Sequence, residues 1–402
     1  MSDKVKNYIE NNWDKCIKHN MQDSGTLIGM PYPYIIPSAG HFDEMYYWDT
    51  YFANKGLMLS GRQEQVKYNT DNMLYLVNKY GFMPNGNRTN YLKNSQPPFL
   101  SCMVYDVYKY YKDTVWLYSA YNTLKTEYVF WQTKRISDIG LNHYDGELKD
   151  EETYEDMAEC FKRRAGFMPD ASRNDIARHC LTTCESGWDI NPRWSYDGYN
   201  FAPVDLNSLM FMLERNMSFF ASELKNGEAN MWSSRAEKRK NVMLDKMDNG
   251  EGLLLDYNFV TGKLSSILSA ASFFSLFAGL ADKKHAEAIV KNLYRLEADY
   301  GILTCEKNTA DGTYQWDYPN GWACLQYIAI KGLDKYGYKK EAKRIAQKYV
   351  RLVDKTFDET GNLWEKYNVV DGSLDVGSEY ETPPMMGWSA GVYLAANNYL
   401  KI

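Results

Sequence analysis

The chain has 402 residues and a formal net charge of −6, with 24% charged and 45% hydrophobic residues. Nucleic-acid backbones require a basic surface, and this charge balance offers none, so we expect no nucleic-acid partner. No apolar run approaches the roughly 18 residues that span a bilayer, so we expect no membrane partner.

The N-terminal segment has an amphipathic helical pattern, with Val5, Ile9, Trp13 and Cys16 on one face. It starts with charged residues and lacks the apolar centre of a secretory leader, which predicts a cytoplasmic protein. In that compartment we expect the seven cysteines to be reduced. The stretch "HCLTTC" (179–184) lacks a fourth ligand at matching spacing, so we expect no metal.

Helical periodicity dominates the rest of the chain. In residues 66–80, Val66, Met73 and Val77 share one face, and Gly81 follows as a C-cap. Similar patterns cover 99–111, 204–224, 285–297, 322–337 and 338–357, whereas alternating strand patterns are few. No linker or low-complexity tract interrupts residues 1–402, which predicts one all-α domain. Helix pairs carrying elaborate loops at regular spacing are typical of an α/α toroid.

The aromatic content is unusual, with 34 Tyr and 11 Trp. Amphipathic rings suit sugars, which have C–H faces and hydroxyl rims, but they also pack helices. Several tryptophans precede an acid: Trp13–Asp14 on the first helix, and Trp48–Asp49, Trp188–Asp189, Trp316–Asp317 and Trp364–Glu365 near loops rich in Gly and Pro. Glycoside hydrolysis requires two carboxyl groups among water-excluding walls. The same acids could equally be helix caps or ion-pair partners.

Two stretches resemble the signatures of trehalases, glycoside hydrolase family 37: "GHFDEMYYWDTYF" (40–52) and "QWDYPNGWACLQ" (315–326). Further blocks follow the family order from about Pro31 onward, including "CESGWDINPRW" (184–194), "LWEKYN" (363–368) and "GSEYETPPMMGWSAGVYL" (377–394). The resemblance implies an (α/α)6 barrel and an inverting α-glucosidase without cofactor, acting on a small carbohydrate.

The resemblance also assigns candidate site residues. Asp189 matches the general acid and Glu365 the general base, and an inverting pair would lie roughly 6.5–9.5 Å apart. The positions that match the glucosyl pocket are Phe42, Tyr46, Trp48, Asp49, Asn85, Gln96, Trp188, Gln315 and Trp316. Asp49 would be an ionised acceptor for sugar hydroxyls, and Glu379 and Glu152 match acids near the leaving group. The alternative for Glu365 is a salt bridge with Lys366.

Three arginines that trehalases place around the second glucose are replaced by His41, Asn94 and Asp150. A glycine-rich lid is shortened, and Pro383 and Pro384 should stiffen the closing loop. Arginine offers a rigid fork of donors that these residues do not reproduce. We therefore expect a small α-glucoside that need not be trehalose, with a leaving group that is smaller, or cationic if Asp150 and Asp43 face it.

Alternatives remain at this point. The chain could act like the related family 63 hydrolases on glucosylglycerate or kojibiose, or be a sugar-binding pseudoenzyme. An epimerase would need histidine bases, and only His41 and His143 fall near candidate loops. A terpene cyclase would need an Asp-rich cluster, and the chain has no adjacent Asp pair.

Overall fold

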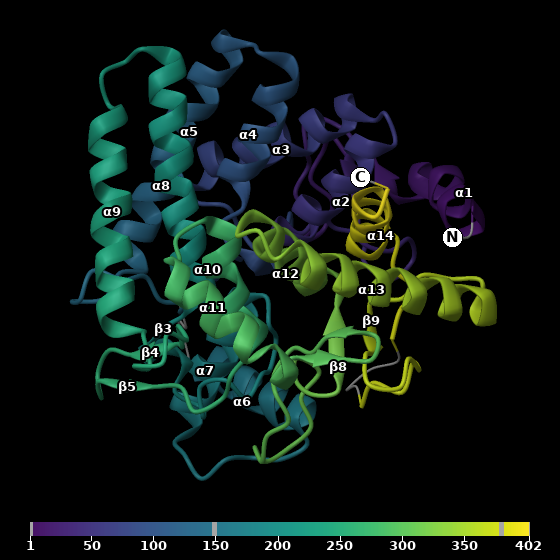
Figure 1. Cartoon of the computed structure of the whole chain (residues 1–402). Helices are drawn as coiled ribbons and strands as arrows, with labels where there is room; N and C mark the ends of the chain where they lie inside the picture. The colour runs from purple at the N-terminus through teal and green to yellow at the C-terminus, as the bar shows by residue number, and fades with distance from the viewer. Residues whose placement is uncertain (1–2, 147–150, 378–381, 402) are drawn as a thin grey trace.

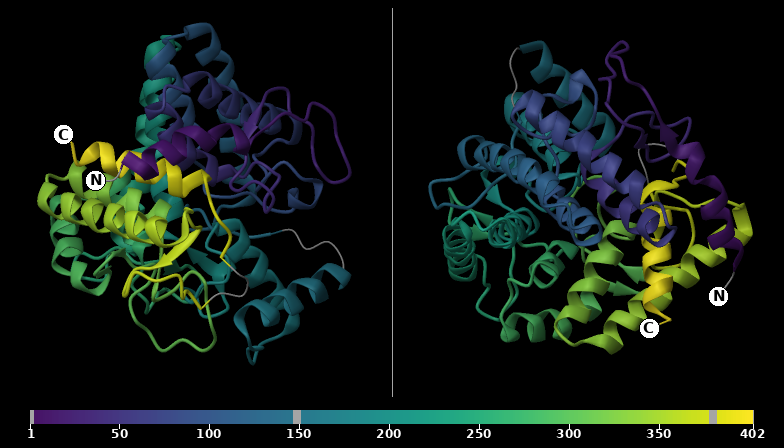
Figure 2. Two further views of the ribbon diagram at one scale, coloured as in Figure 1. Left: turned by 90° about the vertical axis from the view of Figure 1, so that its right-hand side faces the viewer. Right: turned by 90° about the horizontal axis from the view of Figure 1, so that it is seen from above.

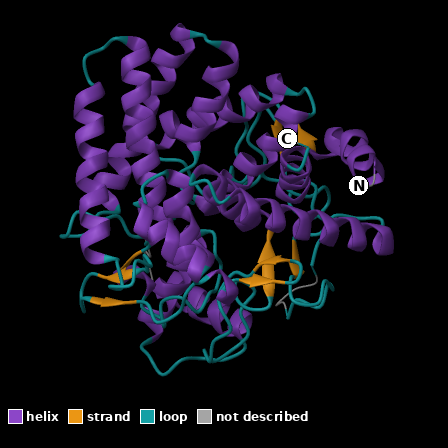
Figure 3. Cartoon of the chain, viewed as in Figure 1, coloured by secondary structure: helices purple, strands orange, loops and turns teal. Residues whose placement is uncertain are grey.

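The structure, a computed structural model, describes residues 3–146, 151–377 and 382–401. It consists of helices joined by long loops, and its strands are only two or three residues long (Figure 3). The all-α class that the periodicity predicts is confirmed.

The described helices follow one another along the whole chain (Figure 1). Their bounds are α1 (Asp3–Asn12), α2 (Tyr47–Leu59), α3 (Gln63–Tyr80), α4 (Leu100–Tyr111), α5 (Thr114–Lys134), α6 (Glu151–Ala165), α7 (Arg173–Ser186), α8 (Val204–Leu224), α9 (Ala229–Lys246), α10 (Phe273–Ala278), α11 (Lys283–Lys291), α12 (Ala323–Lys335), α13 (Lys339–Thr360) and α14 (Gly387–Tyr399).

Six of the described helices close a ring. In ring order α2, α4, α8, α10, α12 and α14 each contact the next, and α14 contacts α2. Outside the ring, α3 and α5 pack against α4, α9 packs against α8, and α13 packs against α12 and α14. Helices α6 and α7 pack chiefly on each other at the edge of the molecule (Figures 1 and 2). The ring confirms the predicted α/α toroid, while the single domain over 1–402 stays a prediction.

The sequence distinguishes inner from outer helices by how much of their surface is apolar. On the inner helix α12 every residue from Ala323 to Ile330 is buried, as expected for a helix surrounded by protein. The outer helix α13 buries one stripe that includes Ala342, Ile345 and Tyr349. On α3, Val66, Met73 and Val77 are buried, and the cap Gly81 has a φ of 83°, as the sequence predicts.

Short antiparallel pairs fix the loops between the helices. They are β1 (Ile17–Lys18) with β2 (Tyr34–Ile35), β3 (Phe201–Ala202) with β4 (Tyr257–Asn258), β4 with β5 (Lys263–Leu264), β6 (Glu297–Ala298) with β7 (Gly301–Ile302), and β8 (Asn320–Trp322) with β9 (Lys366–Asn368). In the last pair Trp322 lies opposite Lys366, which joins the loop before α12 to the loop after α13.

The ring closes where two glycines let α2 and α14 approach. A Cβ atom on Gly391 would lie 2.0 Å from the carbonyl oxygen of Phe52, and one on Gly56 would lie 2.6 Å from the Cα of Gly391. Real Cβ atoms essentially never come that close to backbone, so no larger residue fits without moving a helix. The first and last helices of the ring are therefore held together by backbone contact.

We predict that Gly391→Ala destabilises the protein by about 1–3 kcal/mol, the usual cost of overpacking a filled core. Denaturant unfolding monitored by tryptophan fluorescence measures the change. Asn398→Ala on the exposed side of the same helix is the control and should stay within about 0.5 kcal/mol of the parent. Equal unfolding free energies for Gly391→Ala and the parent would show that the close approach does not hold the ring.

Candidate active site

Segments from distant parts of the chain meet around a small hollow of about 120 Å³. It adjoins a larger cavity of about 960 Å³, and Phe42 and Asp189 lie on the walls of both. The small hollow is lined by Pro37, Phe42, Tyr46, Trp48, Asp49, Gln96, Gly187, Asp189, Gln315, Trp316, Trp322, Glu365, Met385 and Trp388.

Five buried tryptophans form a cluster beside the small hollow, and four of them, all but Trp188, line it. Trp316 stacks on Trp322 with ring centroids 3.8 Å apart, and it contacts Trp48 at 5.6 Å. The rings of Trp188 and Trp388 lie 5.4 and 6.2 Å from Trp316. These indoles come from α2, the loop after α7, the loop before β8, β8 itself and α14. Such a wall excludes water and offers flat apolar faces on which a sugar ring can rest.

The first turn of α2 brings Trp48 and Asp49 into this wall. The side chain of Gln96 accepts a hydrogen bond from the Trp48 backbone N–H at 3.2 Å, in the turn where helix amides lack internal partners. At the helix start, the Tyr46 hydroxyl donates to Glu44 at 2.6 Å, and Arg88 pairs with the same carboxylate at 3.0 Å. The aromatic and acidic residues of 42–49 are thus held by side chains from the loop around 88–96.

Asp189 lies just after α7, and Gly187, which ends this helix, allows the chain to turn toward the hollow. Gly187 caps α7 with a φ of 72°, and a Cβ there would lie 2.8 Å from the Trp48 ring. Only glycine satisfies both the left-handed backbone and the contact with the indole. Upstream, the buried Glu185 pairs with Arg135 at 2.7 Å and accepts the backbone N–H groups of Ser95 and Asp145.

Asp189 sits at the boundary of the two hollows and is about one-third exposed. Its Oδ2 accepts a hydrogen bond from Nη2 of Arg164, a residue in the last turn of α6, at 3.2 Å. Arg164 itself is largely buried, and its Nη1 lies 3.9 Å from the Cys184 sulfur.

Glu365 is buried directly before β9. Lys366 Nζ donates to Glu365 Oε2 at 2.7 Å, and Trp388 Nε1 donates to the Glu365 carbonyl oxygen at 3.1 Å. The salt bridge with Lys366, the alternative that the sequence left open, is therefore present. Glu365 makes this salt bridge and also lines the small hollow.

The charge state of Asp49 differs from the one that the sequence suggested. The pKa of Asp49 is raised to about 8, mainly by burial and in smaller part by the negative charges of Glu365 and Asp189, while a backbone hydrogen bond acts to lower it. At neutral pH Asp49 is therefore mostly protonated, rather than the ionised acceptor that the sequence suggested. The expectation gave too little weight to burial, which is the largest cause of the raised pKa.

The structure brings most of the expected residues together. Phe42, Tyr46, Trp48, Asp49, Gln96, Asp189, Gln315, Trp316 and Glu365 line the small hollow, and His41 lines the larger cavity. Other expected residues lie elsewhere. Trp188 is buried beneath Trp316, with the Arg193 guanidinium 4.4 Å from its ring centre.

Five more expected residues lie away from both walls or outside the described chain. Asn85 and Asn94 are buried, and their side-chain amides donate to backbone carbonyls, among them that of Ser95. Glu152 is exposed on α6. Asp150 and Glu379 fall outside the described residues.

Several lining residues were missed by the sequence reasoning. Trp322 and Trp388 each follow a glycine at a helix start, a pattern that could have flagged them beside Trp316. Arg163 and Arg164 belong to a charged run on an amphipathic helix, which ordinarily indicates a solvated face. Nothing in the sequence alone places those arginines on the larger cavity.

The sequence profile of the trehalase family matches residues 1–400. A periplasmic trehalase of Xanthomonas campestris pv. campestris is 33% identical over 98% of this chain and 73% of its own length. A periplasmic trehalase of Pseudomonas aeruginosa is also 33% identical, over 97% of this chain and 75% of its own. The chain belongs to the trehalase family.

Solved structures agree with this assignment. The neutral trehalase of Saccharomyces cerevisiae superposes with a TM-score of 0.78 at 26% identity, covering 98% of this chain and 79% of that one. A glycoside hydrolase family 63 mannosylglycerate hydrolase from Thermus thermophilus superposes with a TM-score of 0.65 at 15% identity, covering 97% and 99% of the two chains. The second likeness shows a shared fold only. The family makes the chain a glycoside hydrolase of the trehalase type.

The predicted cytoplasmic location is wrong, because the curated relatives that match nearly the whole chain are named periplasmic trehalases. The prediction rested on the amphipathic pattern of the first residues. Val5 and Ile9 are buried on α1, and Trp13 and Cys16 are buried just after it, so the pattern records packing within the fold. Packing of this kind carries no information about the compartment.

Two further properties concern the described part of the chain. Within residues 3–146, 151–377 and 382–401, no helix is both long and apolar enough to cross a membrane. Over the same ranges, His, Cys, Asp and Glu side chains form no group of three or more suited to hold a metal ion.

We predict that the stability of the protein falls as pH rises, partly through Asp49. Its pKa is about 8 in the folded protein and about 3.9 in an unfolded chain, so the folded state holds a proton that the unfolded state releases between these values. This contribution is complete below about pH 4 and is lost as pH rises through 8.

Asp49→Asn removes this contribution, so the variant should gain stability relative to the parent between pH 5 and pH 9. The expected gain is at least about 1 kcal/mol, the value of roughly one pKa unit. Melting curves at pH 5, 7 and 9 measure it. Asp43→Asn, a half-exposed carboxylate paired with Lys18, is the control and should leave the pH dependence unchanged. Parallel curves for Asp49→Asn and the parent would contradict the raised pKa.

Proposed function

We propose that this protein is an inverting α-glucosidase that hydrolyses a small α-glucoside, with Asp189 as general acid and Glu365 as general base. The observation that carries the proposal is that both carboxyl groups line one small hollow with tryptophan walls. Two carboxyl groups on either side of the scissile bond are what glycoside hydrolysis requires.

The position of Asp189 suits the role of acid. It lies on the walls of both the small hollow and the larger cavity, which is where the bond between a glucosyl unit and its leaving group would sit. In the proposed reaction, protonated Asp189 donates its proton to the glycosidic oxygen as the bond to the anomeric carbon breaks.

Glu365 suits the role of base, since a base acts as a carboxylate and its salt bridge with Lys366 requires that form. Glu365 would take a proton from a water molecule that attacks the anomeric carbon from the face opposite the leaving group. The new C–O bond then has the inverted configuration, and the products are the β-sugar and the free leaving-group alcohol.

Asp49, Gln96 and Gln315 would hold the sugar hydroxyls. A protonated Asp49 can donate a hydrogen bond to one sugar hydroxyl and accept a hydrogen bond from another. The names of the bacterial relatives and of the yeast enzyme favour trehalose as a candidate substrate. His41 and Asn94 stand where trehalases have arginines, so we also propose other α-linked glucosides as candidate substrates.

We predict that Asp189→Asn and Glu365→Gln each lower kcat by about 10²–10⁴-fold, the typical worth of one general acid or base. Hydrolysis of trehalose and related α-glucosides by purified protein measures the loss. Asp317→Asn is a matched control, because Asp317 also follows a tryptophan but its carboxylate accepts from Asn308 instead of lining the hollow. Near-parental rates for both catalytic variants would end the assignment, and sugar binding without any hydrolysis by the parent would indicate a pseudoenzyme.

Inversion has its own test. Proton NMR during the first minutes of hydrolysis of an α-linked substrate should show β-glucose before α-glucose, since water attacks the face opposite the leaving group. A sample of free glucose under the same conditions gives the rate of spontaneous anomer exchange. Early α-glucose would instead indicate retention and a different role for Glu365.

A further inference from the structure

The two adjoining hollows differ in charge. The small hollow is lined by the acids Asp49, Asp189 and Glu365, and no Lys, Arg or His lies among its described lining residues. The larger cavity has Arg163 and Arg164 on its wall, and Asp189 is the only acid among its described lining residues. A substrate that spans both hollows therefore meets acids around its sugar and arginines around its leaving group.

Both arginines lie in the last turn of α6, a helix outside the ring. Helix α6 packs along α7, and α7 ends at Ser186, two residues before Trp188 and three before Asp189. This pairing carries Arg164 to within 3.2 Å of the Asp189 carboxylate. The arginine pair is thus built into the same hairpin that positions the proposed acid.

Arg163 is available to a ligand. Its side chain is exposed, and its one hydrogen-bond partner among the described residues is the Cys160 sulfur at 3.8 Å. A thiol sulfur is a weak acceptor, whereas a guanidinium has five donors in a planar fork that matches carboxylate and phosphate. An anion in the cavity would offer far better partners than the sulfur.

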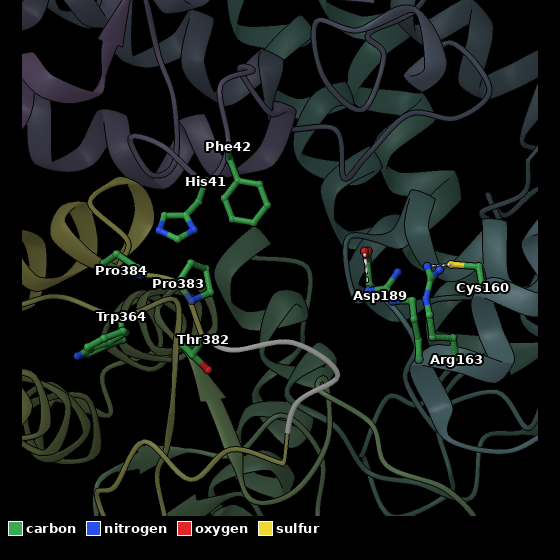
Figure 4. Close-up of a pocket in the computed structure, with 10 residues that line it drawn as sticks. His41, Phe42, Cys160, Arg163, Asp189, Trp364, Thr382, Pro383 and Pro384 are labelled. Atoms are coloured by element: carbon green, nitrogen blue, oxygen red, sulfur yellow. Dashed lines mark hydrogen bonds and ion pairs between the residues drawn. The ribbon is translucent and has the colours of Figure 1, made fainter.

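The opposite wall carries no competing acid among the described residues. Figure 4 shows Asp189, Cys160 and Arg163 on one side of the cavity, and His41, Phe42, Trp364, Thr382, Pro383 and Pro384 on the other. No residue of that second group is an acid. The guanidinium groups that an anion would need are therefore on the α6 side.

We propose that the larger cavity is a leaving-group subsite for an anion, and that Arg163 and Arg164 bind a carboxylate or phosphate on the aglycone of the α-glucoside. The inference rests on the proposed glucosidase function and narrows its substrate class. It replaces the sequence-based idea of a cationic leaving group, because Asp43 pairs with Lys18 and is not among the residues lining the cavity.

The contact between Arg164 and Asp189 gives the anion an effect on the reaction as well as on binding. The Arg164 guanidinium favours the Asp189 carboxylate, whereas a general acid must carry a proton. An anion that draws Arg164 to itself weakens the pairing with Asp189 and places a negative charge nearby. Both changes favour protonated Asp189, so an anionic leaving group should raise kcat as well as lower KM.

Two matched pairs of α-glucosides test the inference with the full chain. α-Glucosylglycerate is compared with α-glucosylglycerol, and trehalose 6-phosphate with trehalose, so that each pair differs only in the anion. We expect kcat/KM to be about 10- to 100-fold higher for at least one anionic member, as hydrogen bonds to charged groups are worth that much. Which of the two pairs shows the higher kcat/KM indicates whether the subsite prefers a carboxylate or a phosphate.

Variants of α6 locate the effect. In Arg163→Gln and Arg164→Gln, the anionic-to-neutral ratio of kcat/KM should fall by about 10-fold or more, and Arg163→Lys should restore part of it through its charge. Lys162→Gln is the matched control, since Lys162 lies in the same turn but pairs with Glu159 and is not among the residues lining the cavity. Its ratio should equal that of the parent.

The possible outcomes distinguish a failure of this inference from a failure of the proposed glucosidase function. If the parent hydrolyses the neutral glucosides as well as or better than the anionic ones, the anionic subsite is wrong and the glucosidase stands. A preference for anions that survives both arginine substitutions also overturns the inference. If none of the four compounds is hydrolysed, the proposed function fails and this inference fails with it.

Discussion

The backbone contact between α2 and α14 is the constraint on which the site depends. Gly391 lies against the Phe52 carbonyl, and this contact joins the first and last helices of the ring. The same two helices carry Trp48 and Trp388, whose rings meet edge to face at 6.0 Å. A wider spacing between the helices would separate these rings and open the base of the hollow to water. The site therefore exists only once the ring has closed.

Exclusion of water by the tryptophans has opposite consequences for the neighbouring acids. Among the described residues, no Lys, Arg or His lines the hollow beside Asp49, and burial raises the pKa of Asp49 to about 8. Glu365 is equally buried but has the Lys366 ammonium at 2.7 Å, and Lys366 in turn lies over the Trp322 ring. One apolar enclosure thus holds a protonated carboxyl beside an ion-paired one, because a local cation offsets the cost of burying charge.

The sequence predicts the toroid and the hollow better than it predicts individual contacts. Periodicity finds α3 and its glycine cap, since one stripe of apolar residues is a local property. The pairs of tryptophan and acid mark the right loops, yet adjacent residues point to different sides. Asp189 faces the hollow while Trp188 is buried under it, and Trp364 lines the larger cavity while Glu365 lines the small one. Which member of a pair faces a ligand depends on tertiary packing, as does the charge state of Asp49.

The positions of the two arginines could not be predicted, because a helix that is polar on one face is ordinarily solvated there. In this molecule α6 and α7 form a hairpin at the edge of the ring, and the end of α6 borders a cavity instead of bulk water. The ring therefore supplies most of the sugar hollow, while the hairpin supplies charged groups beside the leaving group. Asp189, at the end of that hairpin and on both walls, links the two. A change in the hairpin can alter the leaving-group side while the tryptophan-lined hollow, which is anchored to the ring, stays the same.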